Sequence, residues 1–223
     1  WNVQCGAANL HGLYKREKEL TSILFKEDID VAFLTETDIK NVRGNFNLPG
    51  FKTMYPLPMN GDVEDKVRII ALARDDGEIT TSFKMRPDLM SVELPSIWIE
   101  TRSDAGAKRL IGGFYREWNH VGDTTIEGQI NRIKTLANQI ESEHAECERV
   151  VVVGDANLCS ESWDKNNYNL RQISNILRET LSANSFTVQN IGKTYHADHP
   201  DVNGVYVSSA LDHAYTSAAC TVV

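Results

Sequence analysis

Short runs of hydrophobic residues recur along the whole chain and are separated by polar, turn-forming stretches. The most regular run is 150–153, four consecutive valines, which is typical of a strand buried on both faces. Gly154 follows it, and a glycine there ends the strand and lets the backbone come close to another group. Further runs predict strands over residues 1–10, 30–34, 67–74, 79–85, 91–101, 110–116, 186–188 and 205–216.

Hydrophobic residues spaced three or four positions apart predict amphipathic helices. One passes through 15–24, a second runs from 124 to about 146, and a third spans 170–181 and ends at Asn184. The second lies between two predicted strands, as the crossover of a parallel pair would. Residues 41–65, rich in Asn, Gly and Pro, predict an irregular loop. The turn Asp75-Asp76-Gly77 predicts a hairpin between the strands at 67–74 and 79–85.

Composition narrows the class of protein. With 223 residues, 41% of them hydrophobic, the chain can bury a large core, and its length suits a single α/β domain over residues 1–223. No apolar stretch approaches the ~20 residues of a membrane helix, and the N-terminus lacks a signal-peptide pattern, which favours a soluble protein or an excised domain without membrane contact. Cys5, Cys147, Cys159 and Cys220 show no CxxC spacing, which favours free thiols over zinc or disulfides.

The charge balance limits how the chain could bind nucleic acid. A net charge of −8 and a pI near 5.3 disfavour a protein that coats nucleic acid by bulk charge. A local basic groove is still compatible with this balance, and an acidic cluster that binds Mg²⁺ would contribute to it.

Polar side chains stand at the ends of several predicted strands. Strand ends on one rim of a sheet converge on a common crevice, where α/β folds place their chemistry. Asp155 can accept a proton or bind an oxygen-loving cation, Asn157 can donate to an oxyanion, and Arg116 is shaped for a phosphate. Taken singly, each has an ordinary alternative, since Gly-Asp-x-Asn is a common turn and a Glu after a strand is usually solvated. The strand-end residues are Asn9, Glu36, Tyr115, Asp155, Asn157, Asp212 and His213.

Together these groups suit phosphate ester chemistry. Two or three carboxylates would bind a divalent cation, and the amides, the tyrosine and the arginine would hold a phosphate. Such a combination can polarise a phosphodiester and activate water against it.

The motifs resemble those of the endonuclease/exonuclease/phosphatase superfamily and, within it, the endonuclease domain of LINE-type non-LTR retrotransposons. The matching motifs occur in the same order and cover nearly the whole chain. The motifs Thr-Glu-Thr and Leu-Asp-His-x-Tyr-Thr are the most specific of them. The matching segments are Asn9, Leu34-Thr35-Glu36-Thr37, Phe114-Tyr115-Arg116, Gly154-Asp155-Ala156-Asn157, Trp163, Lys193-Thr194 and 209–216.

The resemblance implies a four-layer α/β sandwich of the deoxyribonuclease I type, with two mostly antiparallel sheets faced by helices. It implies Mg²⁺-dependent nicking of double-stranded DNA, with Mn²⁺ as a possible substitute. The 3′-hydroxyl that is left would prime reverse transcription at the target site. The domain would then be part of a larger polyprotein with a reverse transcriptase, monomeric as an isolated domain and active in the nucleus.

The resemblance also implies roles for individual residues. Glu36 would be the principal metal ligand, supported by Asn9. Asp155 would orient or deprotonate the attacking water, Asn157 would help to hold the phosphate, and Tyr115 would contact the phosphate or the metal shell. The implied substrate-binding residues are Arg116, Trp163 and Thr194.

The end of the chain departs from the family pattern. The family has an earlier Asp motif, which orients a catalytic histidine, and a final Ser-Asp-His that supplies it. Leu211-Asp212-His213 resembles the earlier motif, and no Ser-Asp-His follows before Val223. We expect that the true C-terminal strand is lacking. The alternatives are that His213 serves in another register or that the domain is impaired.

Two other functions stay open at this point. A phosphohydrolase of inositol phosphates or phospholipids shares the Asn, Glu and Asp-x-Asn motifs of the superfamily. A DNA-binding domain that does not cut would explain the missing Ser-Asp-His.

Overall fold

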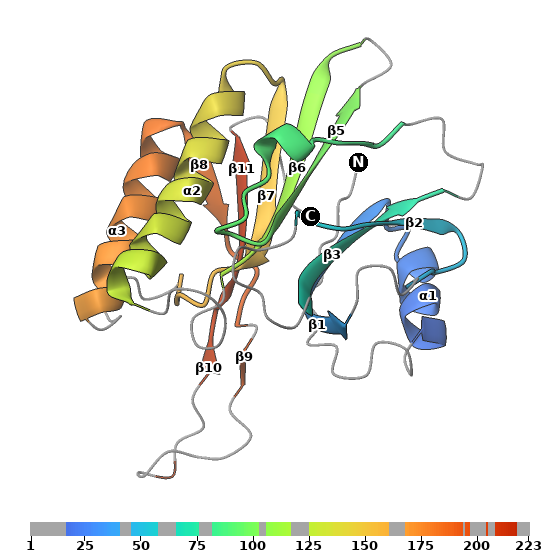
Figure 1. Cartoon of the computed structure of the whole chain (residues 1–223), viewed down its shortest axis with the longest axis horizontal. Coiled ribbons are helices and arrows are strands. Elements are labelled where there is room, and N and C mark those ends of the chain that lie inside the picture. The colour runs from blue at the N-terminus through green and yellow to red at the C-terminus, as the bar shows by residue number, and fades with distance from the viewer. Residues whose placement is uncertain are drawn as a thin grey trace.

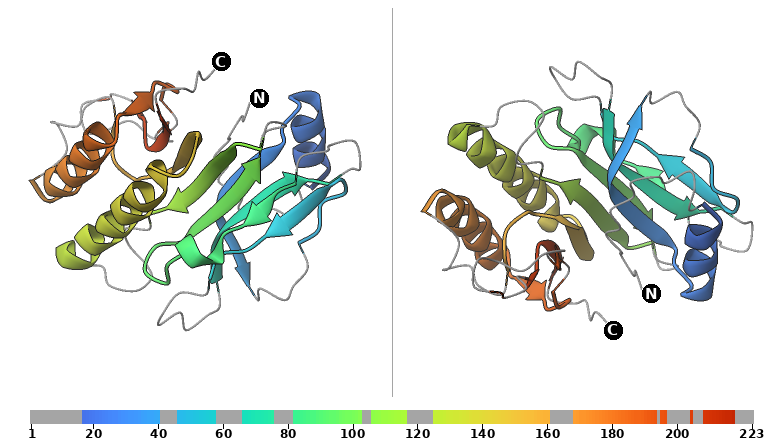
Figure 2. Two further views of the ribbon diagram at one scale, coloured as in Figure 1. Left: turned by 90° about the horizontal axis from the view of Figure 1, so that it is seen from above. Right: turned by 90° about the horizontal axis from the view of Figure 1, so that it is seen from below.

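Two β-sheets lie face to face between helices, which gives four layers (Figures 1 and 2). The computed structural model describes residues 17–40, 46–57, 66–75, 82–102, 106–116, 125–160, 168–193, 195–196, 204 and 208–217. The order of layers is α2 and α3, the six-stranded sheet, the three-stranded sheet, and α1. The predicted four-layer sandwich of two mostly antiparallel sheets is therefore present.

The six-stranded sheet has the order β4-β5-β6-β7-β11-β8. The valine run forms β7 at its centre, paired parallel with β6 and antiparallel with β11. As predicted, α2 is the crossover that joins the parallel pair, and Thr125 caps its first turn through a bond from the Gly128 amide. The bounds of these elements are β4 Lys84–Met85, η2 Pro87–Leu89, β5 Ser96–Arg102, β6 Lys108–Tyr115, α2 Ile126–His144, β7 Arg149–Asp155, α3 Tyr168–Ala183, β8 Phe186–Gln189 and β11 Asp212–Ser217.

The three-stranded sheet has the order β1-β3-β2, and α1 covers its outer face. Alternating residues of β1 divide between its two faces, because side chains of a strand point to opposite sides in turn. Val31 and Phe33 join the core between the sheets, whereas Ala32 and Leu34 pack on the α1 side. The bounds are α1 Glu17–Lys26, β1 Val31–Lys40, β2 Phe51–Met54 and β3 Lys66–Arg74.

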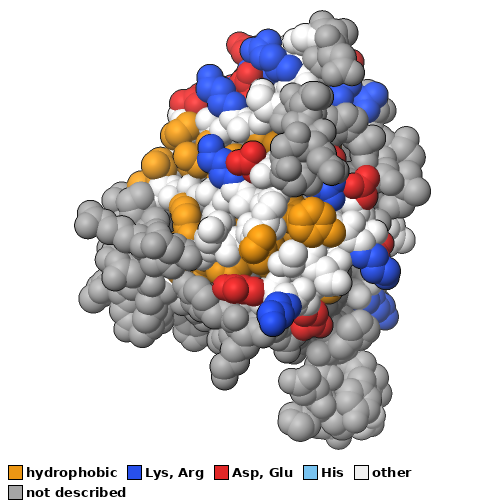
Figure 3. Space-filling model, turned by 90° about the vertical axis from the view of Figure 1, so that its right-hand side faces the viewer, with side chains coloured by type: hydrophobic (Ala, Val, Ile, Leu, Met, Phe, Trp, Pro, Cys, Tyr) orange, Lys and Arg blue, Asp and Glu red, His pale blue; other side chains and the backbone are white. Residues whose placement is uncertain are grey.

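The surface on the side of α1 carries charges of both signs. Acidic and basic side chains are interspersed with hydrophobic ones over the coloured part of this face (Figure 3). A mixed pattern of this kind is typical of a solvated surface, whereas a nucleic-acid-binding face gathers basic residues.

Three predictions of secondary structure need correction. β2 lies inside the segment 41–65, which was predicted to be loop, because Phe51 and Met54 are buried against the core. The predicted hairpin is wrong: β3 belongs to the three-stranded sheet and β4 to the other. Within the predicted polar loop at 192–201, β9 (Tyr195–His196) pairs with β10 (Ser208–Ser209). The predicted strand at 1–10 lies outside the described residues.

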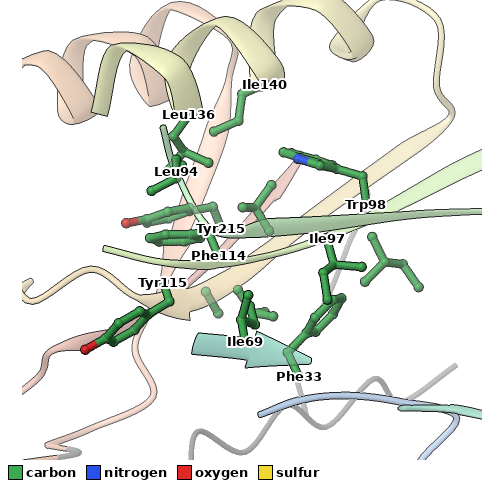
Figure 4. Close-up of a cluster of buried hydrophobic side chains, with 14 of the residues drawn as sticks. Phe33, Ile69, Leu94, Ile97, Trp98, Phe114, Tyr115, Leu136, Ile140 and Tyr215 are labelled. Atoms are coloured by element: carbon green, nitrogen blue, oxygen red, sulfur yellow. The ribbon is translucent and has the colours of Figure 1, made fainter. Parts of the chain in front are cut away.

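Two glycines allow close approach of backbone in the core. A Cβ on Gly113 of β6 would lie 1.9 Å from Cδ1 of Phe33, so the opposing sheet packs directly on this backbone (Figure 4). A Cβ on Gly154 would lie 2.0 Å from the carbonyl oxygen of Phe114, which confirms the close approach predicted after the valine run. The prediction that Gly154 ends the strand is wrong, because β7 continues through it to Asp155.

Gly113→Ala should destabilise the chain by roughly 1–3 kcal/mol, because the added methyl overpacks the contact between the sheets. Urea denaturation followed by circular dichroism measures this change. An unchanged midpoint would mean that the two sheets do not meet at Phe33 in solution.

Candidate active site

Glu36 stands at an irregularity of β1. The register between β1 and β3 shifts between Thr35 and Ile39, and Glu36 has a φ of 54°. Among the described non-glycine residues with positive φ, Asp28 and Ser185 directly follow α1 and α3, where such a conformation is ordinary. Glu36 and Asn157 (φ 50°) do not follow helices, and such strained residues are typical of functional sites. The expectation that Glu36 ends its strand is wrong, since β1 continues to Lys40.

Tyr115 connects the two sheets at this rim. Its hydroxyl donates to Oε1 of Glu36 at 3.1 Å and accepts from Nη2 of Arg68 at 3.3 Å. The tyrosine is 3% exposed, and Figure 4 shows its ring directed away from Phe114 and Tyr215. The structure therefore brings Glu36 and Tyr115 together, as the sequence predicted.

Arg68 belongs to this group and was not predicted. Strict alternation along β3 would place it with Ile70 and Leu72 on the α1 side. The register shift opposite β1 reverses this phase: Val67 packs on the α1 side, and Arg68 lies over the Tyr115 ring at 5.3 Å from its centroid. A charged residue between Val67 and Ile69 was the only signal in the sequence.

Asp155 ends β7 between two other residues of the predicted site. Its cross-strand partners are Tyr115 on β6 and Asp212 on β11, so the three lie side by side on adjacent strands. Oδ1 of Asp155 accepts the backbone amide of Asn157 at 2.8 Å. The Asn157 side chain donates to the carbonyl of Arg116 at 2.9 Å, which fixes the loop after β7.

The pKa of Asp155 is raised to about 7. Burial is the main cause, and the charge of Asp212 adds to it, with a smaller contribution from Glu36. The amide of Asn157 and the charge of Arg116 oppose the shift. A carboxylate with a pKa near neutrality can exchange protons at physiological pH, as a general base must.

Arg116 requires a correction. Its side chain is fully buried and donates to the Ala156 carbonyl at 2.5 Å, to Oε1 of Gln129 at 2.6 Å and to the Asn157 carbonyl at 2.9 Å. Burial lowers its pKa to about 10. A guanidinium held in this way clamps the loop after β7 and does not reach a substrate phosphate.

His213 requires a second correction. It is 1% exposed, its Nε2 bonds the Leu158 carbonyl at 2.8 Å, and its Nδ1 contacts the Tyr215 hydroxyl. Burial lowers its pKa to about 4, so the imidazole is neutral at physiological pH. Neighbouring side chains in a strand point to opposite faces. The Asp212 side chain therefore lies on the face of Asp155, and the His213 side chain points into the interior on the opposite face. The alternative in which His213 is the catalytic histidine is therefore contradicted.

Three predicted site residues lie outside the described part of the chain: Asn9, Trp163 and Thr194. Their proposed contacts with metal or substrate stay predictions.

Glu36 is the described residue that is predicted to bind the metal ion. The described residues contain no group of three or more His, Cys, Asp or Glu side chains placed to hold a metal ion. Mg²⁺ usually keeps several waters and takes only one or two carboxylates together with substrate phosphates. The half-buried carboxylate of Glu36, a hard oxygen donor, fits that requirement.

Asp155→Asn should raise the stability of the chain at pH 8 by at least about 1 kcal/mol, since each unit of raised pKa corresponds to about 1.4 kcal/mol. Between pH 4 and 7 the native wild-type chain holds a proton that the unfolded chain releases, so its stability falls as the pH rises. The asparagine lacks this dependence. Urea denaturation in EDTA at several pH values measures the difference, which should vanish towards pH 4; a constant difference would contradict the raised pKa.

Within the described segments, no helix is long and apolar enough to cross a lipid bilayer.

Residues 1–223 match the sequence profile of the endonuclease/exonuclease/phosphatase family. A comparison with curated protein sequences found no match. Solved structures share the fold at low identity. An AP endonuclease from Leishmania major is 13% identical with a TM-score of 0.66, over 96% of this chain and 78% of that one.

Two further solved structures align with similar fractions of this chain and of their own chains. An AP endonuclease from Archaeoglobus fulgidus is 12% identical with a TM-score of 0.59, over 96% of this chain and 85% of that one. A mannosyl-6-phosphatase from Bacteroides thetaiotaomicron is 14% identical with a TM-score of 0.55, over 98% and 84%. These likenesses confirm the predicted fold class.

Proposed function

The chain belongs to the endonuclease/exonuclease/phosphatase family, whose members are hydrolases of ester bonds, and on this premise we propose that it is a Mg²⁺-dependent endonuclease that nicks double-stranded DNA. The observation that carries the proposal is the row of Tyr115, Asp155 and Asp212 on adjacent strands, with Glu36 joined to it through the Tyr115 hydroxyl. Together these residues supply a proton acceptor, a hydroxyl that positions Glu36, and a carboxylate that would bind the cation, all at one rim.

Asp155 is the proposed general base. Its raised pKa lets it take a proton from water near neutral pH, and the Asn157 amide keeps its carboxylate oriented. The water oxygen bonds to phosphorus while the bond from phosphorus to the 3′ oxygen breaks, and the leaving 3′ oxygen takes a proton from solvent water. The products are a 5′-phosphate and a 3′-hydroxyl.

Glu36 is the proposed metal ligand, supported by Asn9. A bound Mg²⁺ would neutralise the charge that develops on the phosphate. Tyr115 donates its hydroxyl hydrogen to Glu36 and thereby holds this carboxylate at the rim. The charge of Asp212 raises the pKa of Asp155 and so favours the protonated state that Asp155 reaches after accepting the water proton.

We further propose that the nicking activity serves retrotransposition. This role is supported by two sequence motifs, Leu34-Thr35-Glu36-Thr37 and 209–216, which resemble motifs of LINE-type endonuclease domains. In that role the 3′-hydroxyl primes reverse transcription at the target site, and the domain works in the nucleus within a polyprotein that carries a reverse transcriptase.

A phosphomonoesterase is the second candidate, because the fold is shared with a mannosyl-6-phosphatase at a TM-score of 0.55. Release of phosphate from a soluble sugar or inositol phosphate, without nicking of plasmid, would favour it.

Asp155→Ala should lower the rate of plasmid nicking by ~10²-fold or more, because the group that accepts the water proton is lost. The assay converts supercoiled plasmid to open circle with Mg²⁺, beside a reaction in EDTA. Glu148→Gln is the matched control: this carboxylate precedes the other end of β7 and pairs with Arg109, so its loss should leave the rate within about twofold.

Nicking that persists in Asp155→Ala would remove Asp155 from the mechanism. Absence of nicking by the wild-type chain in Mg²⁺, together with salt-sensitive binding of intact duplex, would favour a binding domain that does not cut.

A further inference from the structure

Arg68 is the cationic side chain that contacts the Tyr115 hydroxyl at the rim. Its Nη2 donates to that hydroxyl at 3.3 Å, and its guanidinium carbon lies 5.3 Å from the ring centroid. The hydrogen bond and the cation–π contact together hold the guanidinium beside the Tyr115 ring. Unlike Arg116, which is fully buried, Arg68 is half-buried at the rim.

The other charged residues described at this rim are acidic. Asp155 lies between Tyr115 and Asp212 on adjacent strands, Glu36 accepts from the Tyr115 hydroxyl, and the charge of Asp212 opposes the ionisation of Asp155. An anionic phosphate that approaches this row meets electrostatic repulsion. A cation beside the row therefore has a function in binding that no carboxylate can supply.

Resting on the proposed function, we propose that Arg68 binds the phosphate group of the substrate. Its planar fork matches two phosphate oxygens, and a guanidinium carries enough N–H groups to serve the Tyr115 hydroxyl and an anion together. Because Tyr115 donates to Glu36, a phosphate held by Arg68 would lie beside the carboxylate assigned to the metal. The hydroxyl thus sets the distance between the anion-binding group and the metal-binding group.

A purely structural role for Arg68 makes a different prediction. If Arg68 only positioned the Tyr115 hydroxyl, removing that hydroxyl would abolish every effect of substituting Arg68. A double-mutant cycle with Tyr115→Phe separates the two roles, because the direct contact to phosphate survives in the phenylalanine background.

The experiment measures binding of a short fluorescent DNA duplex by anisotropy in EDTA, at several salt concentrations. We expect Arg68→Gln to weaken binding ~10-fold both in the wild-type and in the Tyr115→Phe background, and to lower the salt slope by about 1. Arg68→Lys keeps the charge without the fork and should recover part of the loss.

Arg74→Gln is the matched control. Arg74 lies on the same strand, six residues and roughly 20 Å further along, where it pairs with Asp28. The substitution Arg74→Gln removes the same charge from β3 at a position away from the rim. We expect its affinity for the DNA duplex to stay within about twofold of wild type.

Unchanged duplex binding in Arg68→Gln, or an effect that disappears in the Tyr115→Phe background, would overturn the proposal. Inorganic phosphate is the second probe, followed by the side-chain Nε–H signal of Arg68 in an NMR titration. A chain that neither nicks nor binds DNA but binds phosphate through Arg68 would contradict the endonuclease and keep this inference. Equal plasmid nicking by the wild-type chain and by Arg68→Gln would keep the endonuclease proposal and contradict the inference about Arg68.

Discussion

The packing of the two sheets against each other is the constraint on which the site depends. Glu36 belongs to the three-stranded sheet, whereas Tyr115, Asp155 and Asp212 belong to the six-stranded sheet. Hydrophobic side chains such as Phe33, Ile69 and Ile97 fill the space between them (Figure 4). The site depends on this apolar contact to fix the position of one sheet relative to the other, and the Tyr115 hydroxyl adds polar bonds to Glu36 and Arg68 across the gap.

Several features of the rim lower the stability of the folded chain, and packing elsewhere must offset their free-energy cost. Glu36 and Asn157 hold backbone conformations that cost of order 1 kcal/mol or more each, and Asp155 lies close to another carboxylate. Val150, Val152 and Val153 of β7 and the inner faces of both sheets are almost completely buried. Residues that are poorly suited to local structure therefore sit at the edge of a well-packed core, an arrangement typical of a site selected for reactivity.

Most of the fold follows from local patterns, and the site follows in part. The valine run, the crossover helix and the strand ends at Tyr115 and Asp155 are visible in the sequence, because periodicity and strand composition are local signals. The partner of a strand depends on distant residues, so the turn at 75–77 wrongly predicted a hairpin between strands of different sheets. The roles of Arg68, Arg116 and His213 could not be predicted, since a register shift or complete burial decides where each side chain points.

The buried clamp made by Arg116 also bears on how this domain can change over evolutionary time. One guanidinium joins the end of β6, the carbonyls of Ala156 and Asn157, and Gln129 in the first turns of α2. A change of Gln129 would leave a buried cation short of an acceptor, and a change of Arg116 would leave the amide oxygen and two carbonyls without their donor. Neither position can drift alone without moving the loop that carries Asn157. The helix that looks remote from the chemistry is thus tied to it, and its first turns are expected to evolve at the pace of the site rather than at the pace of the surface.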